Sequence, residues 1–308
     1  MKRIALFSAF ALFLLSAVSV SAQEKKYYTP QKGDWAVGVV FNPASMSSQM
    51  LAQPKPGEFV GKWISDNAAS PHQMFMLSQD PVAAIRVKYR VSKKWAIRAS
   101  VGLNGSIVNY REYVPDDMAL ALNPDSQNQV VDEIQSKMNS GSLMLGCELM
   151  CGTKAVRFIV GADLLYSIAG GHLLFNYGNK MTDLNRIPSS MPMTSEMKEG
   201  SVNDFTSRFG IAYGRPLDRY NSGYISAFGL SLDMGIEVFI AERISTGLTM
   251  SFTPVAVAFQ PETYTVYEGF CSYTGKVEHY TGYVSPGSNA LLYGIENFGV
   301  RISMNYYF

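Results

Sequence analysis

The last twelve residues of the chain alternate between apolar and mostly polar side chains. Residues 297–308 carry their large apolar side chains at every second position, from Phe298 to Phe308. A period of two is the repeat of a β-strand whose two faces meet different surroundings. The same alternation recurs in seven further segments, near residues 35–41, 85–91, 95–103, 143–149, 156–168, 228–240 and 244–252. The sequence therefore predicts eight strands.

The composition excludes two classes of protein. Although 47% of the residues are hydrophobic and only 17% are charged, no long unbroken apolar run follows residue 22. A helical membrane span needs about 20 consecutive apolar residues, so a bundle of such helices is excluded. The 26 Lys and Arg residues nearly balance the 25 Asp and Glu residues. We therefore expect no nucleic-acid partner.

The amino terminus has the pattern of a secretory signal. Lys2 and Arg3 precede an apolar stretch at 4–20, and the small residues Ser21 and Ala22 follow it. This pattern predicts a signal peptide over 1–22 that is cleaved after Ala22. The alternative is a retained membrane anchor. After cleavage, residues 23–308 are expected to form one domain.

The links between the expected strands alternate strictly between short and long. Three are tight turns, at 92–94, 152–154 and 241–243, and four are long, at about 43–80, 114–140, 172–222 and 260–290. An even number of strands joined in this way is typical of an all-β, antiparallel up-and-down barrel across an outer membrane, with periplasmic turns and extracellular loops. A soluble lipocalin-like barrel is the rival. Partial alternation over Phe205 to Pro216 leaves ten strands as an alternative to eight.

Ten charged residues share the polar face of these strands. One Arg or Lys that points into the bilayer midplane costs about 2–4 kcal/mol, so we expect all ten to line the lumen. An eight-stranded barrel is wide enough only for side chains, which predicts a packed salt-bridge network. An ion-selective ring and a mistaken choice of face are the alternatives. The ten are Arg86, Lys88, Arg90, Arg98, Glu148, Arg157, Asp163, Asp233, Glu237 and Arg301.

Aromatic residues gather near both ends of the expected strands. Because their rings combine an apolar and a polar part, two aromatic girdles are expected at the two membrane interfaces. The short-turn girdle would contain Trp35, Trp95, Phe239, Tyr306 and Phe308, and the other would contain Tyr113, Tyr166, Tyr224 and Tyr293.

Motifs that would carry chemistry are absent from the sequence. Cys147, Cys151 and Cys271 are too few and too far apart along the chain for a disulfide framework, and no metal site is expected. There is no GxSxG, HExxH or phosphate-binding glycine loop. His72, His172 and His279 fall in the expected long loops, so a rim enzyme acting on lipids or peptides remains a third hypothesis. We expect no enzyme and no cofactor.

The carboxyl-terminal strand resembles the terminal strand of Gram-negative outer-membrane barrels. Its final Phe308, the aromatic Tyr306 two residues earlier, and the alternating Ile302 and Met304 match that pattern. In that family the strand is similar to the signal that the barrel assembly machinery reads. Together with the leader and eight strands, the chain resembles the small OmpA/OmpX-type barrels without a periplasmic domain. The resemblance implies residence in the outer membrane, surrounded by its lipid.

The long loops are rich in methionine and aromatic residues, which suit adaptable contact surfaces. The candidates for partner binding are Trp63, Met74, Phe75 and Met76, and Met181, Met191, Met193 and Met197 form a second group. Loops that bury these residues among themselves are the alternative. The leading hypothesis is a structural or partner-binding envelope protein, possibly one subunit of a larger complex. An OmpW-like transporter of small solutes or hydrophobic molecules is the second.

Overall fold

A computed structural model describes residues 30–41, 83–152, 155–190, 211–294 and 298–308. It contains twelve strands and one short helix in these ranges. The elements are β1 (Trp35–Phe41), β2 (Ala83–Arg90), β3 (Trp95–Pro115), α5 (Asp117–Leu122), β4 (Gln129–Cys151), β5 (Val156–Asn176), β6 (Ile211–Asn221), β7 (Ile225–Phe239), β8 (Ile244–Gln260), β9 (Thr263–Cys271), β10 (Lys276–Ser285), β11 (Ser288–Tyr293) and β12 (Phe298–Tyr307). None of the described helices is long and apolar enough to cross a membrane.

Eight of the strands close into an antiparallel barrel. Neighbouring pairs run β1-β2-β3-β4-β5-β7-β8-β12, and β12 pairs back with β1 from Ala36↔Tyr307 to Phe41↔Ile302. Closure leaves no strand edge unpaired in the lipid. The eight-stranded antiparallel barrel that the alternation predicts is confirmed.

The other four strands continue barrel strands beyond short interruptions. β6 precedes β7, and both pair with β5. β9 follows β8 and pairs with β6 and β10. β11 precedes β12, and both pair with β8. The described interruptions fall at 222–224, 261–262 and 286–287. Pro261 and Pro286 have no N–H to give to a ladder, and Gly287 has φ +83°, which favours glycine. The described part of the segment Phe205 to Pro216 belongs to β6, which is a strand extension and not a further strand of the barrel.

Three of the four predicted long loops contain strand residues in their described parts, which corrects the expected boundaries. β3 and β4 stay paired out to Pro115↔Gln129, β5 extends to Asn176, and β9 and β10 form a hairpin within 260–290. Outside the bilayer neither face of a strand meets lipid, so the apolar alternation that reveals a barrel strand fades there. The loop predicted at 43–80 lies outside the described residues.

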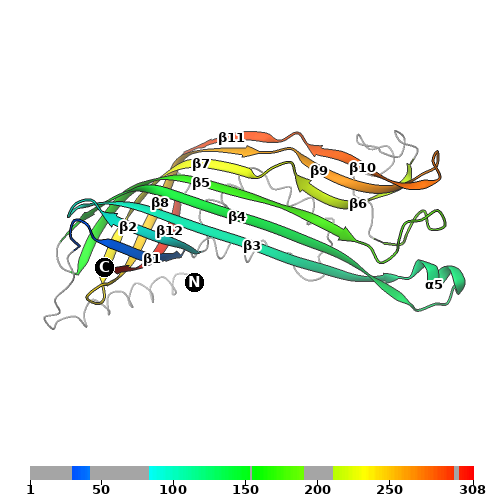
Figure 1. Cartoon of the computed structure of the whole chain (residues 1–308), viewed down its shortest axis with the longest axis horizontal. Helices are drawn as coiled ribbons and strands as arrows, with labels where there is room; N and C mark the ends of the chain where they lie inside the picture. Colours follow the sequence, from blue (N-terminus) through cyan, green and yellow to red (C-terminus); the bar gives the residue numbers. More distant parts are fainter. Residues whose placement is uncertain (1–29, 42–82, 153–154, 191–210, 295–297) are drawn as a thin grey trace, which may run out of the picture.

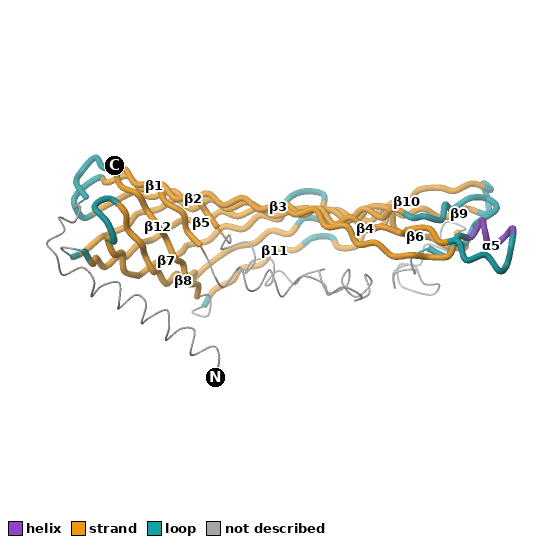
Figure 2. The backbone as a smooth tube through the Cα atoms, turned by 90° about the horizontal axis from the view of Figure 1, so that it is seen from below, coloured by secondary structure: helices purple, strands orange, loops and turns teal. Residues whose placement is uncertain are grey.

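The continued strands form an extension on one side of the barrel. We call extension the outer parts of β3, β4 and β5 together with β6, β9 and β10, which pair in the order β10-β9-β6-β5-β4-β3. Figure 1 shows the barrel at one end, the extension leading away from it, and α5 at the far tip. The elongated shape is also clear in Figure 2. At about 3.3 Å per residue, the 21 residues of β3 span about 69 Å, whereas about 9–11 residues cross a membrane.

The outer surface of the barrel is apolar. Alternate residues such as Val39, Ile97, Leu145, Leu164 and Met250 point outward and are exposed, while their neighbours point inward and are buried. This belt is the surface that lipid covers in a transmembrane barrel. The chain is therefore a transmembrane β-barrel with tight turns at one end and the extension at the other.

Aromatic rings lie on the outer surface at both ends of the barrel. Trp35, Trp95, Tyr306 and Phe308 are exposed near the tight turns. At the other end the rings of Tyr166, Phe228 and Phe259 are in contact, and Tyr224 and Tyr293 are exposed. The prediction for Tyr113 is wrong, because this residue lies two residues before the outer end of β3, far out on the extension. The prediction for Phe239 is wrong. Because it shares the parity of Asp233 and Glu237 on β7, Phe239 points into the lumen, where its ring packs on Tyr307 at 5.3 Å between centroids.

Candidate functional sites in the lumen and at the membrane-distal end

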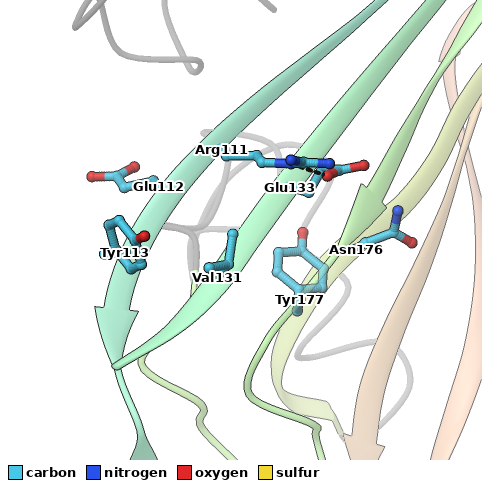
Figure 3. A pocket seen from close by; sticks show the side chains of 7 residues that line it. All are labelled: Arg111, Glu112, Tyr113, Val131, Glu133, Asn176 and Tyr177. Carbon is cyan, nitrogen blue, oxygen red and sulfur yellow. Dashed lines mark hydrogen bonds and ion pairs between the residues drawn. The ribbon is translucent and has the colours of Figure 1, made fainter. Parts of the chain in front are cut away.

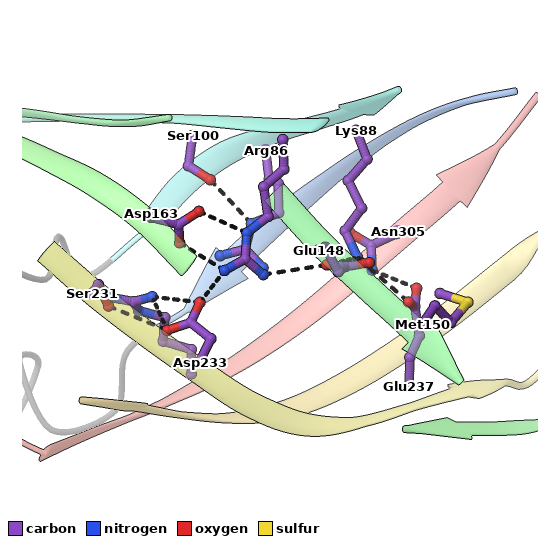
Figure 4. Close-up of polar contacts among 12 residues, drawn as sticks. Arg86, Lys88, Ser100, Glu148, Met150, Asp163, Ser231, Asp233, Glu237 and Asn305 are labelled. Atoms are coloured by element: carbon purple, nitrogen blue, oxygen red, sulfur yellow. Dashed lines mark hydrogen bonds and ion pairs between the residues drawn. The ribbon is translucent and has the colours of Figure 1, made fainter. Parts of the chain in front are cut away.

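All ten charged residues predicted to line the lumen are buried there. Each is at most 4% exposed. They come from β2, β3, β4, β5, β7 and β12, at positions whose strand neighbours point to the belt. Figure 4 shows that side chains from strands on different sides of the barrel point toward one another.

Arg98 lies at the centre of the charge network. Its Nε and Nη2 donate to the two carboxylate oxygens of Asp163, each at 2.8 Å. Nη2 also donates to Asp233 at 2.5 Å, and Nη1 donates to Glu148 at 3.2 Å. One guanidinium thus joins carboxylates from β4, β5 and β7. Bidentate, charge-assisted contacts of this kind are the strongest of the ordinary protein hydrogen bonds.

Glu148 links the Arg98 contacts to a second group nearer the tight turns. The Lys88 ammonium lies 3.0 Å from Glu148 and 3.4 Å from Glu237. In the other direction the network continues from Asp233 to Arg301, at 3.1 Å. Arg86 donates to the hydroxyl of Ser100 at 3.0 Å.

Uncharged side chains complete the network at the end with tight turns. The carboxylate of Glu237 accepts hydrogen bonds from Tyr307 at 2.9 Å, from the amide of Asn305 at 3.0 Å, and from the hydroxyl of Ser245. These three residues are not among the site residues predicted from the sequence. Their position on the same strand face as the charged residues is the signal that could have found them.

Two more cations lie at this end. Arg90 donates to the Met150 sulfur at 2.8 Å and lies 4.0 Å from Glu148. The guanidinium of Arg157 lies over the ring of Phe239, 4.7 Å from its centroid. Arg157 also donates to the Met150 sulfur, at 3.4 Å, so this sulfur accepts a hydrogen bond from both cations. Met150 is a further lumen residue that is not among those predicted from the sequence.

Glycines leave the room that the network needs. A Cβ on Gly161 would lie 2.5 Å from Arg98 Nη2, and one on Gly146 would lie 2.3 Å from Asp163 Oδ1. Both contacts are shorter than real Cβ atoms make, so a side chain at either position would have to displace a member of this ion pair. Small residues in the wall and large charged residues in the middle together fill the lumen.

The membrane-distal end is tied together around α5. Asp116 caps this helix, since its carboxylate accepts from the N–H groups of Met118 and Ala119 at 3.0 and 3.1 Å. The carboxylate of Asp117 accepts from the Asn185 amide at 2.8 Å and from the Ser189 N–H at 2.9 Å. These bonds hold the segment after β5 against the helix.

The same segment is anchored to the extension by buried polar contacts. Asp132 on β4 accepts from the Gly178 N–H at 2.8 Å and from the Ser190 hydroxyl at 3.0 Å. Arg215 on β6 pairs with Glu268 at 2.6 Å, and its guanidinium lies 4.0 Å from the centroid of the Tyr177 ring. The described part of this segment, 177–190, is therefore a fixed part of the extension.

Large apolar side chains remain exposed on this anchored tip. Met118 and Leu122, one turn apart on α5, are 54% and 86% exposed. Leu184 and Ile187, on either side of Asn185, are 85% and 64% exposed. We call these four residues the distal patch.

A hollow lies on the outer part of the extension, at residues of β3 that shortly precede α5 in the chain (Figure 3). Its volume is about 540 Å³, and the Nε of Arg111 and the carboxylate of Glu133 form an ion pair at 2.5 Å on its lining. The lining residues are Arg111, Glu112, Tyr113, Val131, Glu133, Asn176 and Tyr177.

The other residues singled out in the sequence are scattered. The leader 1–22, the loop candidates Trp63, Met74, Phe75 and Met76, and also His72, Met191, Met193 and Met197 lie outside the described residues. Met181 is buried against Phe270, and His279 is exposed on β10. Met304, Tyr306 and Phe308 are exposed on β12, with Ile302 half-buried. Cys147 and Cys151 are exposed, Cys271 is buried, and all three are free. Within the described ranges no group of three His, Cys, Asp or Glu residues is placed to hold a metal ion.

Comparisons with known proteins show a distant likeness in structure. No family model matches the sequence, and no curated protein matches it. Among solved structures, the outer membrane protein OprG from Pseudomonas aeruginosa aligns with a TM-score of 0.30 and 10% identity, over 92% of this chain and 99% of that chain. The barrel assignment comes from the strand pairing and the apolar belt. The finer resemblance to OmpA/OmpX-type barrels stays a prediction.

Proposed function

We propose that the chain is a non-enzymatic outer-membrane barrel that presents its extension outside the cell to a protein partner. The distal patch carries this proposal. Four large apolar side chains are exposed on a tip whose backbone is fixed by the Asp117 and Asp132 contacts. The length of the extension keeps them away from the surrounding lipid. An exposed apolar surface on an ordered scaffold is typical of an interaction site.

The hollow on the extension supports a protein as the partner. Tyr and Arg are enriched where protein interfaces bind most strongly, and here Arg111, Tyr113 and Tyr177 line the hollow. The distal patch would supply the apolar anchors, and the hollow would supply polar contacts. Part of the binding surface is therefore already ordered before the partner arrives, which lowers the entropic cost of association.

Photocrosslinking in whole cells tests this proposal. A photoreactive residue at Leu122 or Leu184 is expected to give the same discrete adduct with one partner, and the same residue at Lys94, in a tight turn at the opposite end, is the control. Leu122→Asp placed in the Leu184 reporter protein should abolish the adduct, because a charge would have to be buried at the interface. An adduct that survives Leu122→Asp, or that forms equally from Lys94, would show that the distal patch does not bind the partner.

The second part of the proposal is that the barrel does not transport solutes. The filled lumen supports it, because the Arg98, Lys88 and Glu237 contacts join opposite sides of the wall. Planar-bilayer recording should show no steady conductance. Steady channels that change with Arg86→Ala or Asp233→Ala would instead establish transport through the lumen.

A further inference from the structure

A row of polar and aromatic side chains crosses the outer face of the extension just beyond the apolar belt. On β5, Leu164 and Ile168 point outward, and His172 lies on the same face two pleats further along. Its registered neighbours are Lys137 on β4 and Tyr220 on β6. Cross-strand partners lie on the same face of a sheet, so this row faces the same way as the belt.

Three tyrosines continue this row across the extension. Tyr220 is registered with Tyr264 on β9, and Tyr264 with Tyr283 on β10. The ring centroids of Tyr220 and Tyr264 lie 5.7 Å apart, and those of Tyr264 and Tyr283 lie 5.0 Å apart. We call these three residues the tyrosine row. A fourth ring, that of Tyr224, lies against the backbone of Gly170.

Two buried polar atoms beside the tyrosine row have no hydrogen-bond partner. They are Nε2 of His172 and Oδ1 of Asp218. Asp218 is registered with Leu174 and Val266, one pleat beyond the His172 row on the same face. Burial raises the pKa of the Asp218 carboxyl, and the nearby His172 and Lys137 act in the opposite direction. Buried polar atoms left without a partner are rare in folded proteins, so two together call for a ligand.

The chemistry of this face fits a sugar. The apolar face of a sugar ring can pack on an aromatic ring, while its hydroxyls both donate and accept hydrogen bonds. His172 and Asp218 are half-buried as residues, so a rotation of their side chains would bring Nε2 and Oδ1 to two sugar hydroxyls, and the Lys137 ammonium adds a donor. A few convergent polar groups beside aromatic side chains are what a small-molecule site needs.

We propose that His172, Asp218 and the tyrosine row bind the sugar headgroup of an outer-leaflet glycolipid. The position favours a glycolipid over a soluble glycan, because the row lies just beyond the belt and on the same face of the wall, at the level where lipid headgroups begin. A lipid whose acyl chains lie against Leu164 and Ile168 would bring its headgroup to His172. The inference depends on the outer-membrane placement in the proposed function, but it does not depend on the protein partner.

Native mass spectrometry of the full-length protein in detergent tests this site. Three probes would be compared: a rough-type lipopolysaccharide, the soluble oligosaccharide released from it, and phosphatidylethanolamine, which has no sugar. The unchanged protein should retain the lipopolysaccharide at least about tenfold more tightly than phosphatidylethanolamine, which corresponds to about 1.4 kcal/mol. Equal retention of these two lipids would overturn the proposal. Binding of the free oligosaccharide as tight as that of the lipopolysaccharide would overturn the assignment to a lipid source.

Matched variants locate the site. His172→Leu combined with Asp218→Leu should lower lipopolysaccharide retention by about tenfold or more. Tyr273→Leu combined with Lys276→Leu changes one aromatic and one charged residue near the β9–β10 turn and should leave retention unchanged. The single variant Tyr264→Leu gives a second measurement if the double variant does not fold, and it should also lose retention. Unchanged lipopolysaccharide retention in a folded His172/Asp218 variant or in Tyr264→Leu would refute this site. That outcome would leave the proposed function standing, because crosslinking from the distal patch tests it separately.

Discussion

Replacement of Arg98 by Met should strongly destabilise the barrel. The side chain is 2% exposed and contacts three carboxylates. After its removal Glu148 still has Lys88 and Asp233 still has Arg301, but Asp163 loses the two hydrogen bonds that Arg98 gives it. A buried charge that loses its partner costs about 3–5 kcal/mol of folding free energy.

An exposed ion pair in the same protein supplies the control. Arg111 also donates through Nε to a carboxylate, that of Glu133, but its side chain is 65% exposed. Arg111→Met should therefore cost only about 0–1 kcal/mol, because an ion pair whose cation is largely exposed is screened by water and contributes little to stability. The two variants make the same substitution in ion pairs that differ mainly in burial.

Urea unfolding of the barrel in lipid vesicles, followed by tryptophan fluorescence, measures both free energies. A further variant that combines Arg98→Met with Asp163→Asn should recover part of the loss, since it removes the stranded negative charge. Equal losses for Arg98→Met and Arg111→Met would refute the reasoning that the lumen network is desolvated. Failure of the second substitution to recover stability would show that Asp163 is not the residue left unpaired.

Two further predictions concern the packing of the lumen. Tyr307→Phe removes a hydrogen bond to the Glu237 carboxylate and should cost about 1.5–3 kcal/mol in the same unfolding assay, whereas Tyr306→Phe, on the exposed side of the same strand, should be neutral; the reasoning fails if the two losses match. Gly161→Ala should cost about 1–3 kcal/mol, because its methyl group would displace the Arg98 guanidinium, and a crystal structure of the variant with Arg98 unmoved would contradict this mechanism.

The sequence predicts the barrel well because two rules act on every strand that crosses lipid. Pleating sends alternate residues to opposite faces, and the bilayer excludes charge from one of them. These rules placed Arg86 and Asp163 on the inner face without knowledge of any contact. They could also have placed Phe239, because it differs from Glu237 by two residues, but its aromatic character suggested the membrane interface instead.

The extension could not be predicted in the same way. In β9 the residues from Thr263 to Cys271 mix apolar and polar side chains on both faces, since neither face must meet lipid. The anchoring of the tip depends on contacts between distant parts of the chain, such as Asp117 with Asn185 and Asp132 with Ser190. The residues next to each of these side chains in the sequence do not indicate its distant hydrogen-bond partner. Without a regular apolar alternation, such segments are interpreted as loops.

The ladder between β3 and β4 determines how a pull on the tip would reach the membrane. The two strands stay in register from Pro115↔Gln129 to Trp95↔Leu149 with no shift, whereas the strands on the other side of the extension are interrupted near Ser222, Pro261 and Pro286. Force along β3 would load its many hydrogen bonds in parallel, as in shear, and would pass directly into the barrel wall. The interrupted side would give way first. Tension that a bound partner applies to α5 would therefore be transmitted along β3 and β4 to the wall of the barrel itself.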